Sequence, residues 1–352
     1  MPEELIQLEN GEPRDTSMRA ESRISDTGGG RAGIATKFRL RTLQEIVNSD
    51  YPETVPIVAN LISPSETALL LARQKEGKST LALQLAIDVS RGEPFLGRYK
   101  TQRASVLYVD YENRPHRLKE RGMDLAKGGA LDNIIFKSYD LISERDVGLF
   151  GAEFERLQEI AEAVSPGLLI IDPLRFAVLR ESTDERAAVD ALDQVSKLRV
   201  ANPAMAVLLV HHLKKAQENF TPVLRNDQRA WIEQVYGSQA LLAHVETICG
   251  LEHDEAGYAF GTVSRSEDSF IIGLEREPGS QRFVVSPNSV QVAGMTPALR
   301  DAWNLLPPEF SRGEGIKLGI ANNTLDRLIR QAKASGLLTQ DPKTGRYKKA
   351  SE

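Results

Sequence analysis

The sequence is poor in cysteine, in long apolar runs and in excess positive charge, and each shortage excludes a class of protein. Its only cysteine is Cys249, so an internal disulfide is excluded and a buried thiol in a reducing compartment is favoured. The net charge of −5 argues against a uniformly basic nucleic-acid binder. Because no apolar run reaches membrane-spanning length and residues 1–11 show no basic and apolar leader, we expect a cytoplasmic protein without membrane contact.

The charge that is present is unevenly distributed. Residues 311–350 contain nine Lys or Arg against three acidic residues, a balance of +6 that leaves −11 for the rest of the chain. Contact with a polyanion is therefore expected at the carboxyl end, unless this segment is a solvated tail. Length and composition predict a disordered tail over 1–36, a large domain over 37–292 and a small domain over 293–352.

A phosphate-binding loop is predicted between the apolar run 67–71 and a helical pattern. The backbone N–H groups of such a loop, and the positive end of the following helix, face the phosphates of a nucleotide. In the G-x-x-x-x-G-K-[ST] pattern, Gly77 allows close backbone approach, Lys78 reaches the β and γ phosphates and Ser79 binds magnesium. The predicted nucleotide-binding residues are Ala72, Arg73, Gln74, Lys75, Glu76, Gly77, Lys78, Ser79 and Thr80.

The first glycine of that pattern is absent, because Ala72 occupies its place. Alanine can adopt a smaller range of φ and ψ angles than glycine, so this position must keep a negative φ or carry modest strain. A degenerate nucleotide site is the alternative interpretation.

Apolar runs alternate with helical stretches along the large domain, which predicts an α/β fold with a mainly parallel sheet flanked by helices. The strands are predicted at 67–71, 105–109, 134–137, 168–171 and 207–210, and the helices at 78–91, 114–127, 150–163 and 184–199. Shorter strand-like pieces at 247–252, 258–264, 269–275 and 281–286 predict an antiparallel extension of the same sheet.

Two carboxylates stand where strands end. Asp172 closes the run Leu168 to Ile171, a position from which a carboxylate can face a nucleotide's magnesium, although an Asp before a Pro often merely ends a strand. Glu112 follows the strand that ends near Asp110. If that strand lies next to the phosphate-loop strand, Glu112 can polarise the water that attacks the γ phosphate; an exposed loop carboxylate is the alternative.

Two adjacent histidines, His211 and His212, end the strand at 207–210 and precede a long polar segment, 213–236. A donor at this position can sense the γ phosphate and transmit its loss to that segment, whereas a surface histidine pair is the plainer interpretation. Long segments without regular pattern inside a domain are usually functional or disordered.

The ordered motifs GKST, LYVDYE, LLIID, LLVHHLKK and YGSQAL resemble those of RecA-like ATPases, most closely the RepA-like group related to hexameric plasmid replicative helicases. The resemblance covers roughly residues 40 to 290. It implies ATP and Mg²⁺ as ligands, with Lys78 and Ser79 as the phosphate-loop pair. It further implies Glu112 as the catalytic glutamate, Asp172 as the metal-supporting aspartate and His211 or His212 as the γ-phosphate sensor.

The sequence departs from that family at three places. Ala72 replaces a glycine, Tyr236 stands where the group usually has Arg, and Leu274-Glu-Arg276 replaces the Lys-x-Arg that ring helicases extend toward a neighbouring subunit's nucleotide. Arg276 keeps the arginine of that pattern and is the first candidate for a finger acting in trans, with Arg225 and Arg229 next. A finger in trans implies a homo-oligomer, most plausibly a hexameric ring. A local salt bridge of Arg276 with Glu275 or Glu277 is the alternative.

Two regions are predicted to contact DNA, more plausibly single-stranded DNA. The segment 213–236 resembles by position the segment with which RecA-like motors grip a strand, and Phe220 and Trp231 offer rings for stacking on bases. A short helix at 298–306, a second helix that starts at 322–324 and runs to 333, and a hairpin over 336–349 together resemble a winged helix-turn-helix, with Lys343 and Arg346 on the wing, although winged helices also dock proteins. The predicted DNA-contacting residues are Lys214, Lys215, Arg225, Arg229, Arg327, Arg330 and Lys333.

The sequence as a whole therefore predicts an ATP-hydrolysing RecA-like protein that acts on DNA. One hypothesis is a ring-forming replicative helicase or translocase of a plasmid, phage or mobile element. The alternative is an ATP-switched replication initiator, recombination accessory or regulator that does not unwind DNA.

Overall fold

The computed structural model describes residues 40–50, 54–139, 146–178, 185–215, 222–237, 239–255, 257–265, 269–286, 299, 302–303, 305–334 and 337–349. The predicted tail over 1–36 lies outside these residues. The chain divides into two units, 1–53 and 54–352. In the first unit, helix α2 (Leu43–Val47) starts at a capping box formed by Thr42 and Glu45 and buries none of its residues.

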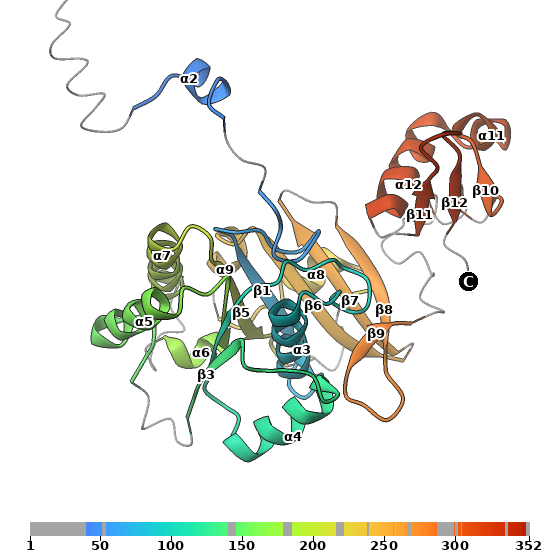
Figure 1. The fold of residues 1–352 in the computed structure, drawn as a ribbon. Helices are drawn as coiled ribbons and strands as arrows, with labels where there is room; N and C mark the ends of the chain where they lie inside the picture. Colours follow the sequence, from blue (N-terminus) through green and yellow to red (C-terminus); the bar gives the residue numbers. More distant parts are fainter. Residues whose placement is uncertain are drawn as a thin grey trace, which may run out of the picture. The chain divides into compact units, whose positions relative to one another are not determined.

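Within the second unit, nine of the described strands form one sheet in the order β3-β2-β4-β5-β1-β6-β7-β8-β9 (Figure 1). The strands β1 to β6 all run parallel, and β7, β8 and β9 continue the sheet in antiparallel pairs. Their bounds are β1 (Thr67–Ala72), β2 (Val106–Asp110), β3 (Ile134–Ser138), β4 (Leu168–Asp172), β5 (Ala206–His212), β6 (Thr247–Asp254), β7 (Gly257–Ser264), β8 (Phe270–Arg276) and β9 (Phe283–Val285).

This sheet confirms the predicted fold class of a mainly parallel sheet flanked by helices with an antiparallel extension. One detail was wrong, because the strand at 247–254 pairs in parallel with β1 and the antiparallel part begins one strand later. The helices of this region are α3 (Lys78–Arg91), α4 (Pro115–Ala126), α5 (Gly151–Val164), α6 (Leu174–Ala177), α7 (Glu185–Ala201), α8 (Gln228–Ile232) and α9 (Ala240–Ala243).

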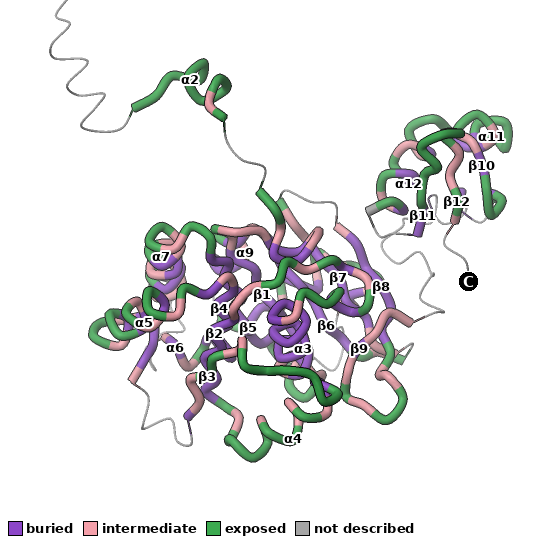
Figure 2. Tube along the Cα trace, viewed as in Figure 1, coloured by how far each residue is buried: buried purple, intermediate pink, exposed green. Residues whose placement is uncertain are grey.

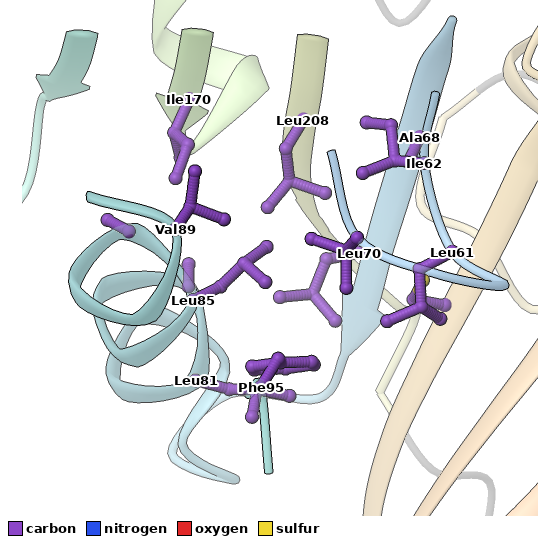
Figure 3. Packing of buried hydrophobic residues seen from close by; sticks show 14 of the residues in the cluster. Leu61, Ile62, Ala68, Leu70, Leu81, Leu85, Val89, Phe95, Ile170 and Leu208 are labelled. Atoms are coloured by element: carbon purple, nitrogen blue, oxygen red, sulfur yellow. The ribbon is translucent and has the colours of Figure 1, made fainter. Parts of the chain in front are cut away.

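Helix α3 covers one face of the sheet and is buried along most of its length (Figure 2). Its side chains Leu81, Leu85 and Val89 recur every four residues, so they form one stripe that packs against Leu70 and Leu208 of the central strands (Figure 3). Shortening a fully buried leucine in such a layer costs about 2 to 5 kcal/mol. This packing fixes the amino end of α3 against the carboxyl end of β1.

Helices α5, α6, α7 and α9, together with the segment that contains α8, cover the opposite face of the sheet. The central strands are therefore buried on both faces, which explains why they read as continuous aliphatic runs rather than as alternating patterns. The largest side chain in this second layer is Trp231 of α8, which is fully buried.

The carboxyl-terminal residues form a small module with its own core. Two helices lie against a three-stranded antiparallel sheet of order β10-β12-β11. The bounds are β10 (Glu309–Phe310), α11 (Arg312–Lys317), α12 (Asn322–Ala334), β11 (Leu338–Gln340) and β12 (Tyr347–Lys349). No helix in the described part of the chain is long and apolar enough to cross a membrane.

Candidate nucleotide site

Residues 73–77 connect the end of β1 to the start of α3, as the motif predicts. Gly77 has φ 99° and ψ 15°, a left-handed conformation that glycine adopts without steric cost. Ala72 ends β1 and is absent from the residues with positive φ, so its replacement of glycine causes no left-handed strain. Lys75, at φ 68°, carries the unusual backbone conformation instead.

Asp172 lies fully buried at the end of β4. The hydroxyl of Tyr108 donates a hydrogen bond to its Oδ2 at 2.7 Å, whereas Oδ1 has no hydrogen-bond partner among the described residues. Burial raises the pKa of Asp172, while the Tyr108 hydroxyl, the Lys78 ammonium and the Ser79 hydroxyl act to lower it. A buried carboxylate with a vacant oxygen beside Ser79 fits a bound magnesium ion, which prefers oxygen ligands.

Glu112 reaches the same site from the end of β2. The carboxylate of Asp110 accepts hydrogen bonds from the backbone N–H groups of Glu112 and Asn113 at 3.0 and 2.8 Å, which fixes the turn after the strand. Glu112 is an exposed residue with 37% of its side chain accessible, so burial of its carboxylate is only partial. This partial burial raises the pKa of Glu112, and the Lys78 ammonium opposes the shift. The premise that this strand neighbours the phosphate-loop strand was wrong, since β4 and β5 lie between them. The charge of Lys78 nevertheless acts on the pKa of Glu112.

The structure distinguishes the two candidate histidines. His212 pairs with Ala72 in the β5–β1 register, and its Nε2 lies 3.9 Å from Oε1 of Glu112. Both of its ring nitrogens are buried and have no hydrogen-bond partner within the described part of the chain, and burial together with Lys78 lowers its pKa to about 3. His211 faces the other side of the sheet, where its Nε2 lies 2.8 Å from the carbonyl oxygen of Tyr236. His212 therefore faces the predicted phosphate site and His211 holds the end of the segment 213–236.

Arg175 belongs to the electrostatic environment of this site, although sequence reasoning missed it. It lies in α6, just after the strand that ends at Asp172. Its positive charge opposes the upward shift of the Glu112 pKa and adds to the downward shift of the His212 pKa. Its side chain is exposed. Its position three residues after Asp172, the predicted metal-supporting aspartate, is the feature of the sequence that could have identified it.

Arg276 ends β8 beside the phosphate loop of its own chain. Its guanidinium lies 3.5 Å from the centroid of the Phe283 ring and 5.3 Å from that of Tyr258, and it donates a hydrogen bond to the carbonyl oxygen of Gln281. A Cβ atom built on Gly77 would lie 2.7 Å from its Nη2. Glu277, which sequence reasoning considered as a partner, forms an ion pair with Lys127.

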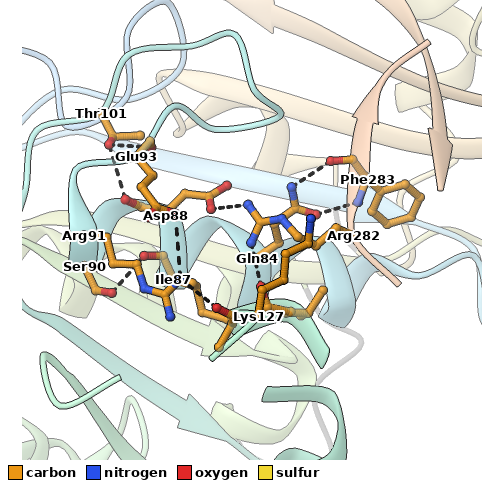
Figure 4. Close-up of polar contacts among 12 residues, drawn as sticks. Gln84, Ile87, Asp88, Ser90, Arg91, Glu93, Thr101, Lys127, Arg282 and Phe283 are labelled. Carbon is orange, nitrogen blue, oxygen red and sulfur yellow. Dashed lines mark hydrogen bonds and ion pairs between the residues drawn. The ribbon is translucent and has the colours of Figure 1, made fainter. Parts of the chain in front are cut away.

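Two polar residues of α3, which sequence reasoning also missed, hold β9 in place (Figure 4). Gln84 exchanges two hydrogen bonds with the backbone of Phe283, at 2.8 and 2.7 Å. Asp88 forms an ion pair with Arg282; burial raises its pKa to about 6, and the Arg282 charge opposes that shift. Both side chains are buried polar groups at a four-residue spacing inside an otherwise apolar helix, which was the signal available in the sequence.

The predicted DNA-contacting residues lie in different environments. Arg225 is held inside the protein by an ion pair with Asp254 at 2.9 Å and by a hydrogen bond to the carbonyl oxygen of Tyr258 at 2.6 Å. Trp231 is fully buried, so it presents no ring to bases, and Phe220 lies outside the described residues. The other predicted residues are exposed, namely Lys214, Lys215 and Arg229 in the segment 213–236 and Arg327, Arg330 and Lys333 on α12.

The predicted wing residues of the carboxyl-terminal module also differ from each other. Lys343 is exposed. Arg346 is instead shared between two carboxylates, those of Glu309 and Glu314, at 3.2 and 3.0 Å. Among the described residues of this module, α12 carries three exposed cations, and Lys317, Lys343 and Lys348 add exposed charge outside that helix.

Comparison with known proteins places this site within a family. A solved structure of a KaiC-like protein from the archaeon Pyrococcus horikoshii OT3 is similar at 14% identity and a TM-score of 0.42, covering 67% of this chain and 99% of that chain. No curated protein matches the chain. A family model described as an AAA domain matches residues 35–218, just over half of the chain, and this span contains the phosphate loop, Glu112, Asp172 and His212. The chain therefore belongs to the AAA domain family.

Proposed function

We propose that this protein binds ATP with Mg²⁺ and hydrolyses it. The observation that carries the proposal is the meeting of three strand ends beside the phosphate loop: His212 pairs with Ala72, and its Nε2 lies 3.9 Å from Oε1 of Glu112. Asp172 ends the strand next to that of Glu112, and the charge of Lys78 acts on all three groups. A residue constellation that brings a cation, two carboxylates and a neutral imidazole to a phosphate loop suits phosphoryl transfer to water.

Each residue has a role that follows from its environment. Lys78 and the backbone of residues 73–79 hold the phosphates, and Ser79 and Asp172 would hold the magnesium ion. That ion, when bound, would neutralise negative charge on the phosphates. Glu112 accepts the proton of the attacking water, a task that its raised pKa favours. His212, kept neutral by burial, retains an N–H donor for the γ phosphate or for Glu112.

Two variants test this proposal through binding and turnover measured separately. Lys78→Ala is expected to weaken binding of a fluorescent ATP analogue and to abolish phosphate release. Glu112→Gln is expected to bind the analogue as the unaltered protein does while turnover falls at least 100-fold, since a general base contributes about 10² to 10⁴ in rate. Turnover that survives in both variants would refute the site.

We further propose that DNA is the partner whose contact is coupled to ATP hydrolysis. The support is twofold. Lys214, Lys215 and Arg229 are exposed in the segment that directly follows the sensor histidine, and α12 of the carboxyl-terminal module presents three further exposed cations. That module has the element order of a winged helix, with two helices followed by a hairpin, which supports groove or phosphate contact by α12.

The DNA contact is tested by the salt dependence of binding. Removing Arg327, Arg330 and Lys333 together is expected to lower the slope of log affinity against log salt by about 2 to 3, because each phosphate contact contributes about 0.7 to 0.9. The matched control removes three exposed cations at the start of α4, namely Arg114 at its N-cap and Arg117 and Lys119 within the helix. An equal reduction of that slope in both triple variants would show that net charge, and not the position of the cations on α12, determines DNA binding.

We propose that the protein works as a ring-forming replicative helicase or translocase. Strand displacement that is lost in Glu112→Gln would support a motor. An ATP-locked Glu112→Gln variant that keeps full DNA-dependent activity would instead identify the non-unwinding switch. Because Arg276 lies at its own phosphate loop, ring formation needs a direct test, namely molecular-mass measurement in solution with ATP, with and without single-stranded DNA. A homo-hexamer is expected.

A further inference from the structure

A buried carboxylate joins the phosphate loop to the segment 222–236, and no part of the proposed chemistry uses it. Glu252 of β6 has a side chain only 4% exposed and lies on the sheet face opposite α3. Arg73, the first residue of the phosphate loop, turns its guanidinium away from the predicted phosphates and donates from Nη1 to Oε1 of Glu252 at 2.5 Å. The loop is thereby tied to the far face of the sheet.

The same carboxylate holds the segment 222–236 at two points. The backbone N–H of Leu224 donates to Oε2 of Glu252 at 2.6 Å, and the indole N–H of Trp231 donates to Oε1 at 2.8 Å. Arg73 reaches the segment directly as well, because its Nη2 donates to Oε1 of Gln234 at 2.8 Å. One phosphate-loop side chain and three points of the segment therefore share a single buried polar cluster.

Such a cluster behaves as a unit. A buried carboxylate is strongly disfavoured without its donors, so the donors move with it rather than leave it. The ring of Trp231 also lies against Gly250, where a Cβ atom would come within 2.7 Å of Cζ3. This close fit leaves the indole no room to move independently of β6. Any shift of Arg73 must therefore be accommodated by the segment or break the cluster.

We propose that Glu252 and Arg73 are positioning residues that transmit occupancy of the phosphate loop to the segment 222–236. The inference rests on the proposed function, since it takes the phosphates of a bound nucleotide as the event that displaces the loop. The transmission runs through the sheet face opposite the nucleotide and is separate from His212, whose carbonyl oxygen accepts a hydrogen bond from the backbone N–H of Tyr236. The segment is thus connected to the nucleotide site both through Glu252 and through the backbone of His212.

The chain contains its own reporter for this connection. Its two tryptophans are Trp231, in the cluster, and Trp303, in the carboxyl-terminal module. In a Trp303→Phe background, Trp231 emission and its quenching by acrylamide report the cluster alone. Addition of a slowly hydrolysed ATP analogue with Mg²⁺ is expected to change both signals, and binding is measured in parallel with a fluorescent nucleotide.

The deciding variant is Glu252→Gln, which keeps the shape of the side chain and removes its charge. Its Trp231 response to nucleotide is expected to fall at least fivefold while nucleotide affinity changes less than threefold. Arg225→Gln is the matched control, because it removes an ion pair of the same segment that does not touch the phosphate loop, and it should keep the response. Glu252→Asp, which keeps the charge and shortens the reach, serves if Glu252→Gln fails to fold and should also lose the response.

The outcomes separate the two proposals. A full response in Glu252→Gln, or an equal loss in Arg225→Gln, would overturn the transmission. Nucleotide binding by the Trp303→Phe protein without any change of Trp231 would overturn it as well. Absence of nucleotide binding in that protein would refute the proposed function itself, and the transmission with it.

Discussion

Nε2 of His212 lies 3.9 Å from Oε1 of Glu112, on the sheet face that carries the phosphate loop. The two groups come from strands β5 and β2, which are separated in the sheet by β4. The pKa of Glu112 is raised and that of His212 is lowered, in both cases chiefly by burial. Burial therefore prepares a carboxylate with improved basicity beside an imidazole that stays neutral.

This pair predicts the acid limb of the pH profile of ATP turnover. Turnover should fall with decreasing pH as Glu112 takes up a proton, and the midpoint should lie above the ordinary value for a glutamate because its pKa is raised. His212 should add no limb near pH 6.5 because its pKa is about 3. Single-turnover rates between pH 4.5 and 8.5 measure this. A midpoint that moves in His212→Gln but not in Glu112→Asp would contradict the assignment of the base.

His212 also predicts how fold stability depends on pH. Its pKa is lowered from 6.5 to about 3 on folding, so the unfolded chain binds the proton first, and stability present above pH 6.5 is lost as the pH falls. Between pH 7.5 and 5 this loss amounts to about 2 kcal/mol. Urea unfolding should therefore show a smaller pH dependence for His212→Gln, by roughly that amount. His116→Gln, on the exposed face of α4, is the control.

The Tyr108 hydroxyl predicts an effect on magnesium. In Tyr108→Phe the hydrogen bond to Oδ2 of Asp172 is lost, so the buried carboxylate loses a donor and its pKa rises further. The Mg²⁺ concentration for half-maximal turnover should rise about tenfold, which corresponds to about 1.4 kcal/mol. Tyr99→Phe removes a buried hydroxyl for which the described residues offer no hydrogen-bond partner and should leave the magnesium requirement unchanged. Equal effects of the two changes would remove Tyr108 from the site.

Gly77→Ala predicts a loss of nucleotide binding that leaves the fold intact. The alanine must adopt a φ near 99°, and its Cβ would meet Nη2 of Arg276 and Cζ of Phe283 at 2.7 and 3.1 Å. The left-handed conformation alone costs about 1 to 2 kcal/mol, so affinity for the ATP analogue should fall at least about fivefold. Ala72→Gly, which restores the usual glycine at a position without positive φ, should change affinity less than threefold.

Arg276 predicts the outcome of a mixing experiment. Arg276→Ala and Lys78→Ala should each lose ATP turnover, and an equimolar mixture should regain none, because the guanidinium lies at the Gly77 of its own chain. Recovery of about a quarter of the activity of the unaltered protein, as random pairing at a shared site allows, would support the finger in trans suggested by the sequence. Both variants must retain DNA binding for the mixture to be interpreted.

The sequence was sufficient for a mainly parallel sheet and for the loop between β1 and α3. Local patterns reveal both the buried strands and the Gly77-Lys78-Ser79 motif. The predicted bounds of α3 are those observed. The contacts of Arg225 with Asp254 and of Arg276 with Phe283 could not be predicted from the sequence, because the sequence does not reveal the register of the strands that carry their partners. The choice between His211 and His212 likewise needed the sheet register, since a shift of one residue exchanges the two faces.

The bridge between Leu213 and Val235 means that the polypeptide leaves and rejoins the sheet at one point. Leu224 and Trp231 are buried within that excursion, so a change in its length that spares them and the bridge leaves the pairing of β5 with β1 in place, because loop length affects closure entropy only weakly. Among relatives that keep the phosphate site, we expect this segment to differ in length and composition according to the nucleic acid that each protein binds.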